Sequence, residues 1–146
     1  MKASSFTRFR RSLAGTAAIE FAILAPPFLG LAFGVYEFGR ALWTLEALQE
    51  SATQGARCVG VQSTSCYSSG SYSQTDTIDY VQGVASGWGI SVPTADIVPT
   101  QSTTCGTVAG FAQVQITYQF ATVVSLLIPA LANQTLTATA CFPDNP

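Results

Sequence analysis

The chain has 146 residues, of which 48% are hydrophobic and only 10% are charged. A soluble domain usually carries about a quarter of charged residues, so part of this chain is expected to lie in a medium other than water. The length allows one domain of about 100 residues plus an anchor, but not two full cores. The acidic pI of about 4.8 provides no basic surface and excludes nucleic acid as a partner.

The first eleven residues hold most of the positive charge. Four of the six basic residues lie there, and no acidic residue precedes Glu20. These four are Lys2, Arg8, Arg10 and Arg11. Because basic residues stay on the cytoplasmic side of a membrane helix, this leader, residues 1–15, predicts a cytoplasmic N-terminus and an exported C-terminal part.

Residues 13–36 form an apolar run in which Glu20 is the only charge. Its 24 residues would span about 36 Å as a helix, enough for a hydrocarbon core of about 30 Å. We therefore predict a transmembrane helix over residues 16–36. A cleavable secretory signal is the alternative, but its apolar run is shorter. A carboxylate costs about 2.5 to 3.5 kcal/mol at mid-bilayer, so Glu20 points to a partner within the membrane, unless the segment is a simple signal-anchor that tolerates it.

A proline pair, Pro26–Pro27, interrupts the apolar run. Proline removes backbone hydrogen bonds and kinks a helix near the preceding turn, which is tolerated where neighbouring helices cover the opened backbone. The pair is therefore either an inert kink or a point of bending in an assembly.

Residues 37–57 continue with helical periodicity outside the membrane. The apolar positions are Leu42, Leu45, Leu48, Ala52 and Ala56, against polar Glu46, Gln49, Glu50 and Gln54. This pattern predicts an amphipathic extension that supports a C-terminal sheet and ends at Gly55 to Cys58. Glu37 and Arg40 are spaced for a modest ion pair on a solvated face.

Residues 58–146 have the composition of a small α+β domain. Residues 59–75 are rich in Ser, Gly, Thr and Tyr and indicate an exposed loop. A short helix is predicted over 76–88, with Thr75 or Asp76 as N-cap. Its expected inner face is Ile78, Val81, Ala85 and Trp88.

Three strands follow in the prediction. Alternating polar and apolar residues place them over 97–104, 110–122 and 134–142, with one register irregularity near Ala112. The uncharged stretch Val123 to Leu131 lies between two of them and is too short for a second span. It is a buried crossover, an exposed apolar patch or a re-entrant segment.

All four cysteines fall in the exported part: Cys58, Cys66, Cys105 and Cys141. An even number of exported cysteines predicts two disulfides. Among three connectivities we favour Cys58 with Cys66, which closes a short Ser-rich loop, and Cys105 with Cys141. A four-cysteine metal site is the alternative, although no CxxC pair is present.

The sequence lacks the residue combinations that a catalytic site would need. The chain has no histidine, so there is no Ser-His or Cys-His pair, and the acids Asp76, Asp79, Asp96 and Asp144 form no recognisable constellation. Asp76 and Asp79 fit helix-start positions instead. We predict no enzymatic activity, no cofactor and no metal.

The stretch GTAAIEFAILAPPFLGLAFGVYEFGRAL resembles the N-terminal segment of TadE/TadG-like minor pseudopilins of tight-adherence (Flp) pilus systems, which are type IV pilin-like. The matching positions are Gly15, Glu20, Phe21, Pro26, Glu37, Gly39 and Arg40. The resemblance implies cleavage between Gly15 and Thr16 by a prepilin peptidase. Glycine suits an extended backbone in a protease cleft, and the new amine of Thr16 would lie about one and a quarter turns from Glu20.

The resemblance also implies an architecture and a location. The expected fold is α+β and pilin-like: a long N-terminal helix, transmembrane and continuing into the periplasm, against a small antiparallel sheet. The partners would be the lipid bilayer, the peptidase, other pilins and pseudopilins, and the pilus assembly platform. The protein would be a single-pass inner-membrane subunit, able to reach the cell surface in a pilus. The alternative is an uncleaved single-pass envelope protein with an exported binding domain.

Overall fold

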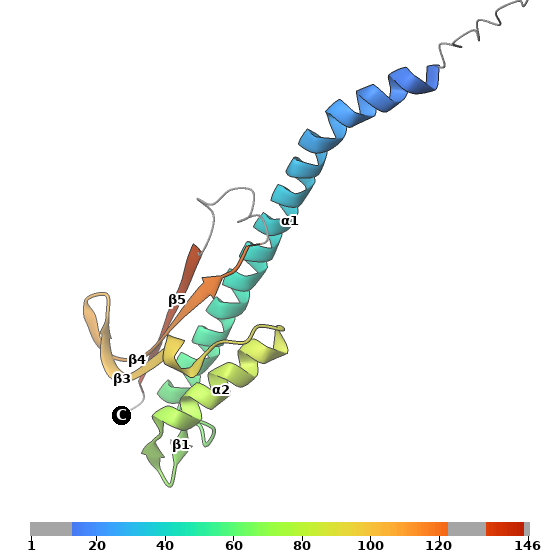
Figure 1. Cartoon of the computed structure of the whole chain (residues 1–146). Coiled ribbons are helices and arrows are strands. Elements are labelled where there is room, and N and C mark those ends of the chain that lie inside the picture. Colours follow the sequence, from blue (N-terminus) through green and yellow to red (C-terminus); the bar gives the residue numbers. More distant parts are fainter. Residues whose placement is uncertain (1–12, 123–133, 145–146) are drawn as a thin grey trace, which may run out of the picture. The chain divides into compact units, whose positions relative to one another are not determined.

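A computed structural model describes residues 13–122 and 134–144, with side chains from Thr16 onward. The chain divides into two compact units, Met1–Tyr36 and Glu37–Pro146. The elements are a long helix, a second helix, a small hairpin and a three-stranded antiparallel sheet, which confirms the α+β class (Figure 1). The stretch Val123 to Leu131, for which three placements were considered, lies outside the described residues.

The first helix, α1, runs from Leu13 to Gly60 and includes both Pro26 and Pro27. It contributes to both units, and its end lies beyond the predicted stop at Gly55 to Cys58. Gly55 does not end the helix, because its role is in packing. A Cβ added there would collide with Val81 of the second helix and lie 3.3 Å from Val114 of the sheet.

The loop after α1 contains a small hairpin, β1 (Tyr67–Ser68) with β2 (Ser71–Tyr72). The second helix, α2, spans Gln74–Gly87. Its N-cap is Ser73, not Thr75 or Asp76, because the Ser73 hydroxyl accepts a hydrogen bond from the backbone N–H of Asp76. The helix therefore begins two residues earlier than the sequence pattern indicated.

A 3-10 turn, η1 (Thr94–Asp96), leads into the sheet β3 (Ile97–Cys105), β4 (Val108–Phe120) and β5 (Gln134–Pro143), in the order β3-β4-β5. The predicted register irregularity near Ala112 is present, because the β3-β4 register shifts between Thr100, which pairs with Gln113, and Thr103, which pairs with Phe111. A second shift lies between Thr103 and Thr104. Gly110, at φ +86°, provides the extra residue on β4, and such bulges bend a strand.

The core of the Glu37–Pro146 unit lies between α1, α2 and one face of the sheet (Figure 1). Its fully buried side chains include Leu48, Val81, Val114 and Ile116. The α1 stripe was predicted correctly from Leu48 onward, but Leu42 is 51% exposed and Leu45 is 38% exposed. Thr44, Ala47 and Ser51 take the inner positions instead, because small side chains let a helix approach a sheet closely.

Candidate functional site along the long helix

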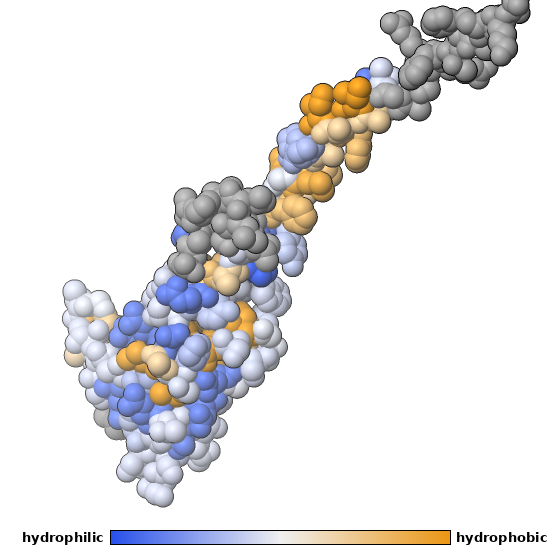
Figure 2. Space-filling view, viewed as in Figure 1, coloured by the Kyte–Doolittle hydropathy of each residue, from blue (hydrophilic) through white to orange (hydrophobic). Residues whose placement is uncertain are grey.

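The apolar segment of α1 has no protein covering. Side chains from Thr16 to Tyr36 are exposed, apart from the partly buried Ala25. Among the described residues, α1 holds the one helix that is long and apolar enough to cross a membrane, with a mean hydropathy of 1.8 in its best window (Figure 2). Such a surface is stable only against lipid or other apolar helices.

Glu20 is exposed on this segment, as are Phe21 and Pro26. The ion pair that the described residues form involves other side chains, so the structure brings no cation to the Glu20 carboxylate. Phe21 helps to line an apolar hollow with Leu24 and Phe28.

The predicted processing site, Gly15 and Thr16, lies inside α1, which begins at Leu13. The sequence argument relied on extended backbone at Gly15. In the structure this peptide bond is helical, so cleavage would require the first turn to unwind. Helix ends open at little cost, and glycine lowers that cost further.

The Glu37, Gly39 and Arg40 motif lies at the start of the Glu37–Pro146 unit, and two of its residues form a partly buried contact. The Arg40 Nη2 donates to the Glu37 Oε2 at 3.2 Å and to the carbonyl oxygen of Ala121 just after β4. Its guanidinium also lies 4.7 Å from the ring centroid of Phe120. Glu37 is only 8% exposed, so the expectation of a solvated face is wrong for this pair.

This contact joins the start of the Glu37–Pro146 unit to the end of β4. Its two partners on the strand side were not predicted, because they lie about 80 residues further along the chain. Gly39 has no such role, since nothing lies within 4 Å of a Cβ built on it. Gly39 therefore faces open space within the described chain.

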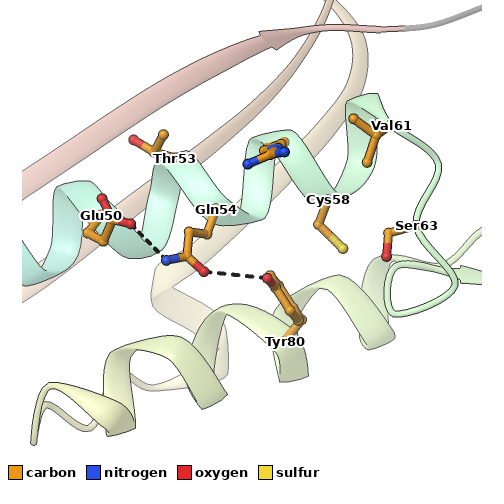
Figure 3. A pocket seen from close by; sticks show the side chains of 8 residues that line it. Glu50, Thr53, Gln54, Cys58, Val61, Ser63 and Tyr80 are labelled. Atoms are coloured by element: carbon orange, nitrogen blue, oxygen red, sulfur yellow. Dashed lines mark hydrogen bonds between the residues drawn. The ribbon is translucent and has the colours of Figure 1, made fainter.

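A second feature, which the sequence did not reveal, is a groove of about 440 Å³ between α1 and α2 (Figure 3). Gln54 donates to Glu50 at 2.7 Å and accepts from the Tyr80 hydroxyl at 3.5 Å. Arg57 also lines it and is exposed. The helical spacing of Glu50, Gln54 and Arg57 is the signal that could have indicated a polar surface here. The network holds α1 to α2 and contains no nucleophile beside a base.

Both disulfides of the favoured connectivity are present. Cys58 pairs with Cys66 and Cys105 with Cys141, at Cα separations of 6.0 and 6.5 Å. The first is buried beside Val59 and Ala112. The second joins β3 to β5 across the bent β3-β4 hairpin. Over the described residues, no group of three or more His, Cys, Asp or Glu side chains is placed to hold a metal ion.

The comparison with protein families gives one result. Residues 15–57, about three tenths of the chain, match the family described as TadE-like protein. This confirms the resemblance seen in the sequence, and the match covers the processing site, Glu20 and the Glu37–Arg40 pair. Searches of curated proteins and of solved structures found no significant match.

Proposed function

We propose that this chain, TadE-like over residues 15–57, is a minor pseudopilin: a structural and assembly subunit of a tight-adherence (Flp) pilus or a related secretion apparatus. The observation that carries the proposal is the uncovered apolar segment of α1 with Glu20 in it, followed directly by a folded, disulfide-linked domain. A subunit that moves from a bilayer into a helical assembly needs such a segment. Its apolar surface can exchange lipid for neighbouring helices at small cost.

In the proposed pathway the protein enters the inner membrane with its N-terminus in the cytoplasm and its C-terminal domain in the periplasm. A prepilin peptidase removes residues 1–15. The amine of Thr16 and the carboxylate of Glu20 then offset part of each other's desolvation cost, within one subunit or across to a neighbouring pilin. This pairing gives Glu20 a registry role on the assembly platform.

The first test is the intact mass and N-terminal sequence of the protein from native membranes, with and without the peptidase. The proposal expects a start at Thr16 that depends on the peptidase. A start at Met1 in both strains would contradict processing. Cleavage near Ala25 or Gly34 would identify a secretory signal instead.

The second test separates assembly from anchoring. Glu20→Ala should leave the protein inserted and processed but remove it from isolated fibres and from cross-linked complexes with other pilins. Glu46→Ala is the matched control, because Glu46 is an exposed acid of α1 outside the apolar segment. Equal assembly of both variants would overturn the registry role of Glu20.

One observation favours the second candidate function, an uncleaved single-pass envelope protein with an exported binding domain. The α1 helix runs without a break through Gly15 and Thr16, which hides the bond from a protease until the turn unwinds. The groove beside Tyr80 would then be the natural binding surface. The mass measurement separates the two candidates, because only the pseudopilin loses its leader.

A further inference from the structure

A cavity of about 310 Å³ opens in the exported unit beside Arg40. Its walls come from α1, from the end of α2 and from the end of β4. The residues that matter here are Arg40, Trp43, Trp88, Tyr118, Phe120 and Ala121. They combine one cation with four aromatic rings, a composition unlike the aliphatic core of the unit.

The aromatic rings and the guanidinium of this cavity contact one another in two pairs. Trp43 and Trp88 meet edge to face, with ring centroids 5.2 Å apart, while Arg40 lies over Phe120. The Arg40 Nη2 is used by Glu37 and Ala121. Its Nε is buried and has no hydrogen-bond partner among the described residues, and the same holds for the Glu37 Oε1. The Arg40 side chain as a whole is 36% exposed, so a ligand acceptor can reach its guanidinium from the cavity.

The chain itself restricts where this cavity lies. Arg40 is four residues after Tyr36, the end of the apolar segment, and α1 is continuous between them. Four residues span at most about 14 Å in any arrangement of the two units, so Arg40 stays within reach of the headgroup layer at the end of the apolar segment. Trp and Tyr are enriched at this level of a membrane, so a cavity with this lining is placed to meet lipid headgroups.

We propose that the cavity binds the headgroup of a zwitterionic phospholipid of the outer leaflet, with the phosphate accepting from the Arg40 guanidinium and the ammonium lying against the Trp43–Trp88 pair. The inference rests on the proposed membrane anchoring. Charge decides the class of lipid: Arg40 is already neutralised by Glu37, so the site attracts no net anionic group. A cation over tryptophan faces is favourable, which matches an ethanolamine or choline ammonium.

The only two tryptophans of the chain, Trp43 and Trp88, both line this cavity, so intrinsic fluorescence reports on it alone. The full chain is reconstituted in vesicles of phosphatidylethanolamine and phosphatidylglycerol, with part of the lipid carrying a nitroxide on its headgroup. In Trp43→Phe, the emission of Trp88 should fall several-fold. A control carries Trp43→Phe, Trp88→Phe and Val61→Trp, which puts the probe at an exposed position beyond the far end of α1. It should lose little emission.

The outcomes separate this proposal from the anchoring on which it rests. The remaining tryptophan is Trp43 in the Trp88→Phe variant and Trp88 in the Trp43→Phe variant. If Trp43 is quenched but Trp88 is quenched no more than the tryptophan of the Val61→Trp control, the membrane anchor stands and the headgroup site is overturned. If neither Trp43 nor Trp88 is quenched, anchoring itself fails.

A second measurement does not depend on tryptophan substitution. Native mass spectrometry of the detergent-extracted wild type should show a retained phosphatidylethanolamine, which Arg40→Gln loses and Arg57→Gln keeps. Retention of phosphatidylglycerol to the same extent would overturn the role of the ammonium. A change of tryptophan emission on adding inorganic phosphate alone would show that the site takes a free anion and not a lipid.

Discussion

At the scale of single residues, the contact between Glu37 and Arg40 gives the clearest prediction. Arg40→Gln leaves the Glu37 carboxylate nearly buried without a counter-charge. Removing one partner of a buried pair is costly, and the Arg40 side chain is 36% exposed, which reduces the loss. We expect the free energy of unfolding of the full chain in detergent to fall by about 1 to 3 kcal/mol, measured by urea denaturation.

The matched control for this pair is Arg57→Gln, an exposed arginine outside the ion pair that the described residues form. Its effect should stay within about 0.5 kcal/mol. Equal effects of the two substitutions would show that the Glu37–Arg40 pair contributes nothing to stability. Glu37→Gln should cost less than Arg40→Gln, because a neutral amide can still accept from the guanidinium.

Two tyrosines of the β1-β2 hairpin predict a pH dependence. Burial is the main cause that raises the pKa of Tyr72; the neighbouring Thr77 side chain lowers this pKa in part, and Tyr67 raises it again. Burial, followed by the negative charge of Asp144, raises the pKa of Tyr67. The folded state therefore keeps these protons to higher pH than the unfolded state, whose phenols ionise near pH 10.

The sign follows from proton binding: above about pH 10 the unfolded state binds fewer protons, so stability falls as the pH rises. Below that pH the two tyrosines contribute no slope. Urea midpoints of Tyr72→Phe should decline less steeply above pH 10 than those of the wild type. Parallel declines would show that Tyr72 ionises as easily in the folded protein as in the unfolded one.

Residue-scale prediction from sequence succeeded where the partner was local. The Cys58–Cys66 bridge closes a loop with a sequence separation of eight. The Ser-rich composition of this loop indicated the pairing in the sequence. The pairing of Arg40 with Ala121 and Phe120 could not be predicted in this way. An i,i+3 spacing identifies Glu37 as the neighbour of Arg40, but the contacts of Arg40 with Ala121 and Phe120 come from a strand end distant in the sequence.

At the scale of elements, α1 shows what periodicity can determine. The pattern placed Leu48, Ala52 and Ala56 correctly on the inner face. It failed at Leu42 and Leu45 because apolar residues need not face protein next to a membrane, while Thr44 and Ser51 turn inward by bonding to the carbonyls of Arg40 and Ala47. Hydrophobicity alone cannot separate a side chain that packs on the sheet from one that faces lipid or another subunit.

Glycine substitutions test the packing of α1 as an element. Gly55→Ala adds a methyl group that collides with Val81, and overpacking of this kind costs about 1 to 3 kcal/mol. The intrinsic helix preference of alanine, at most about 1 kcal/mol over glycine, offsets only part of this cost. We expect a lower unfolding midpoint for the full chain in urea.

Gly39→Ala is the matched substitution on the same helix, and it should be neutral or stabilising by up to about 1 kcal/mol, because it meets open space. A loss of stability at Gly39 would mean that the residue packs against something within the chain. A stable Gly39→Ala that no longer enters fibres would instead assign this glycine to a contact between subunits.

At the scale of the whole molecule, two separate patterns in the sequence were sufficient to predict the fold class. The apolar run predicted a helix long and apolar enough to cross a membrane, and strand alternation predicted all three long strands close to their observed bounds. The alternation indicated one irregularity near Ala112, which is the register shift between Thr100 and Thr103, but not the second shift between Thr103 and Thr104. Cys105, which follows both shifts, lies at a Cα distance of 6.5 Å from Cys141.

The charge distribution of the whole chain predicts its orientation. Of the six basic residues only Arg40 and Arg57 follow the apolar segment, against seven acids, so the part after Tyr36 has a net charge of −5 while residues 1–15 are basic. Because the four disulfide-bonded cysteines lie in that part, and disulfides form in oxidising compartments, their redox state in cells reports the orientation of each chain.

We expect the wild type in growing cells to resist thiol-specific mass tagging unless it is first reduced. Replacing Lys2, Arg8, Arg10 and Arg11 by glutamine removes the charge that keeps the N-terminus in the cytoplasm, so a fraction of chains should insert inverted and accept four tags without reduction. Arg57→Gln, which changes a charge on the exported side, should leave every chain oxidised. If the quadruple variant is also fully oxidised, the basic leader does not determine the orientation, and the length of the apolar segment and the folding of the exported unit must do so.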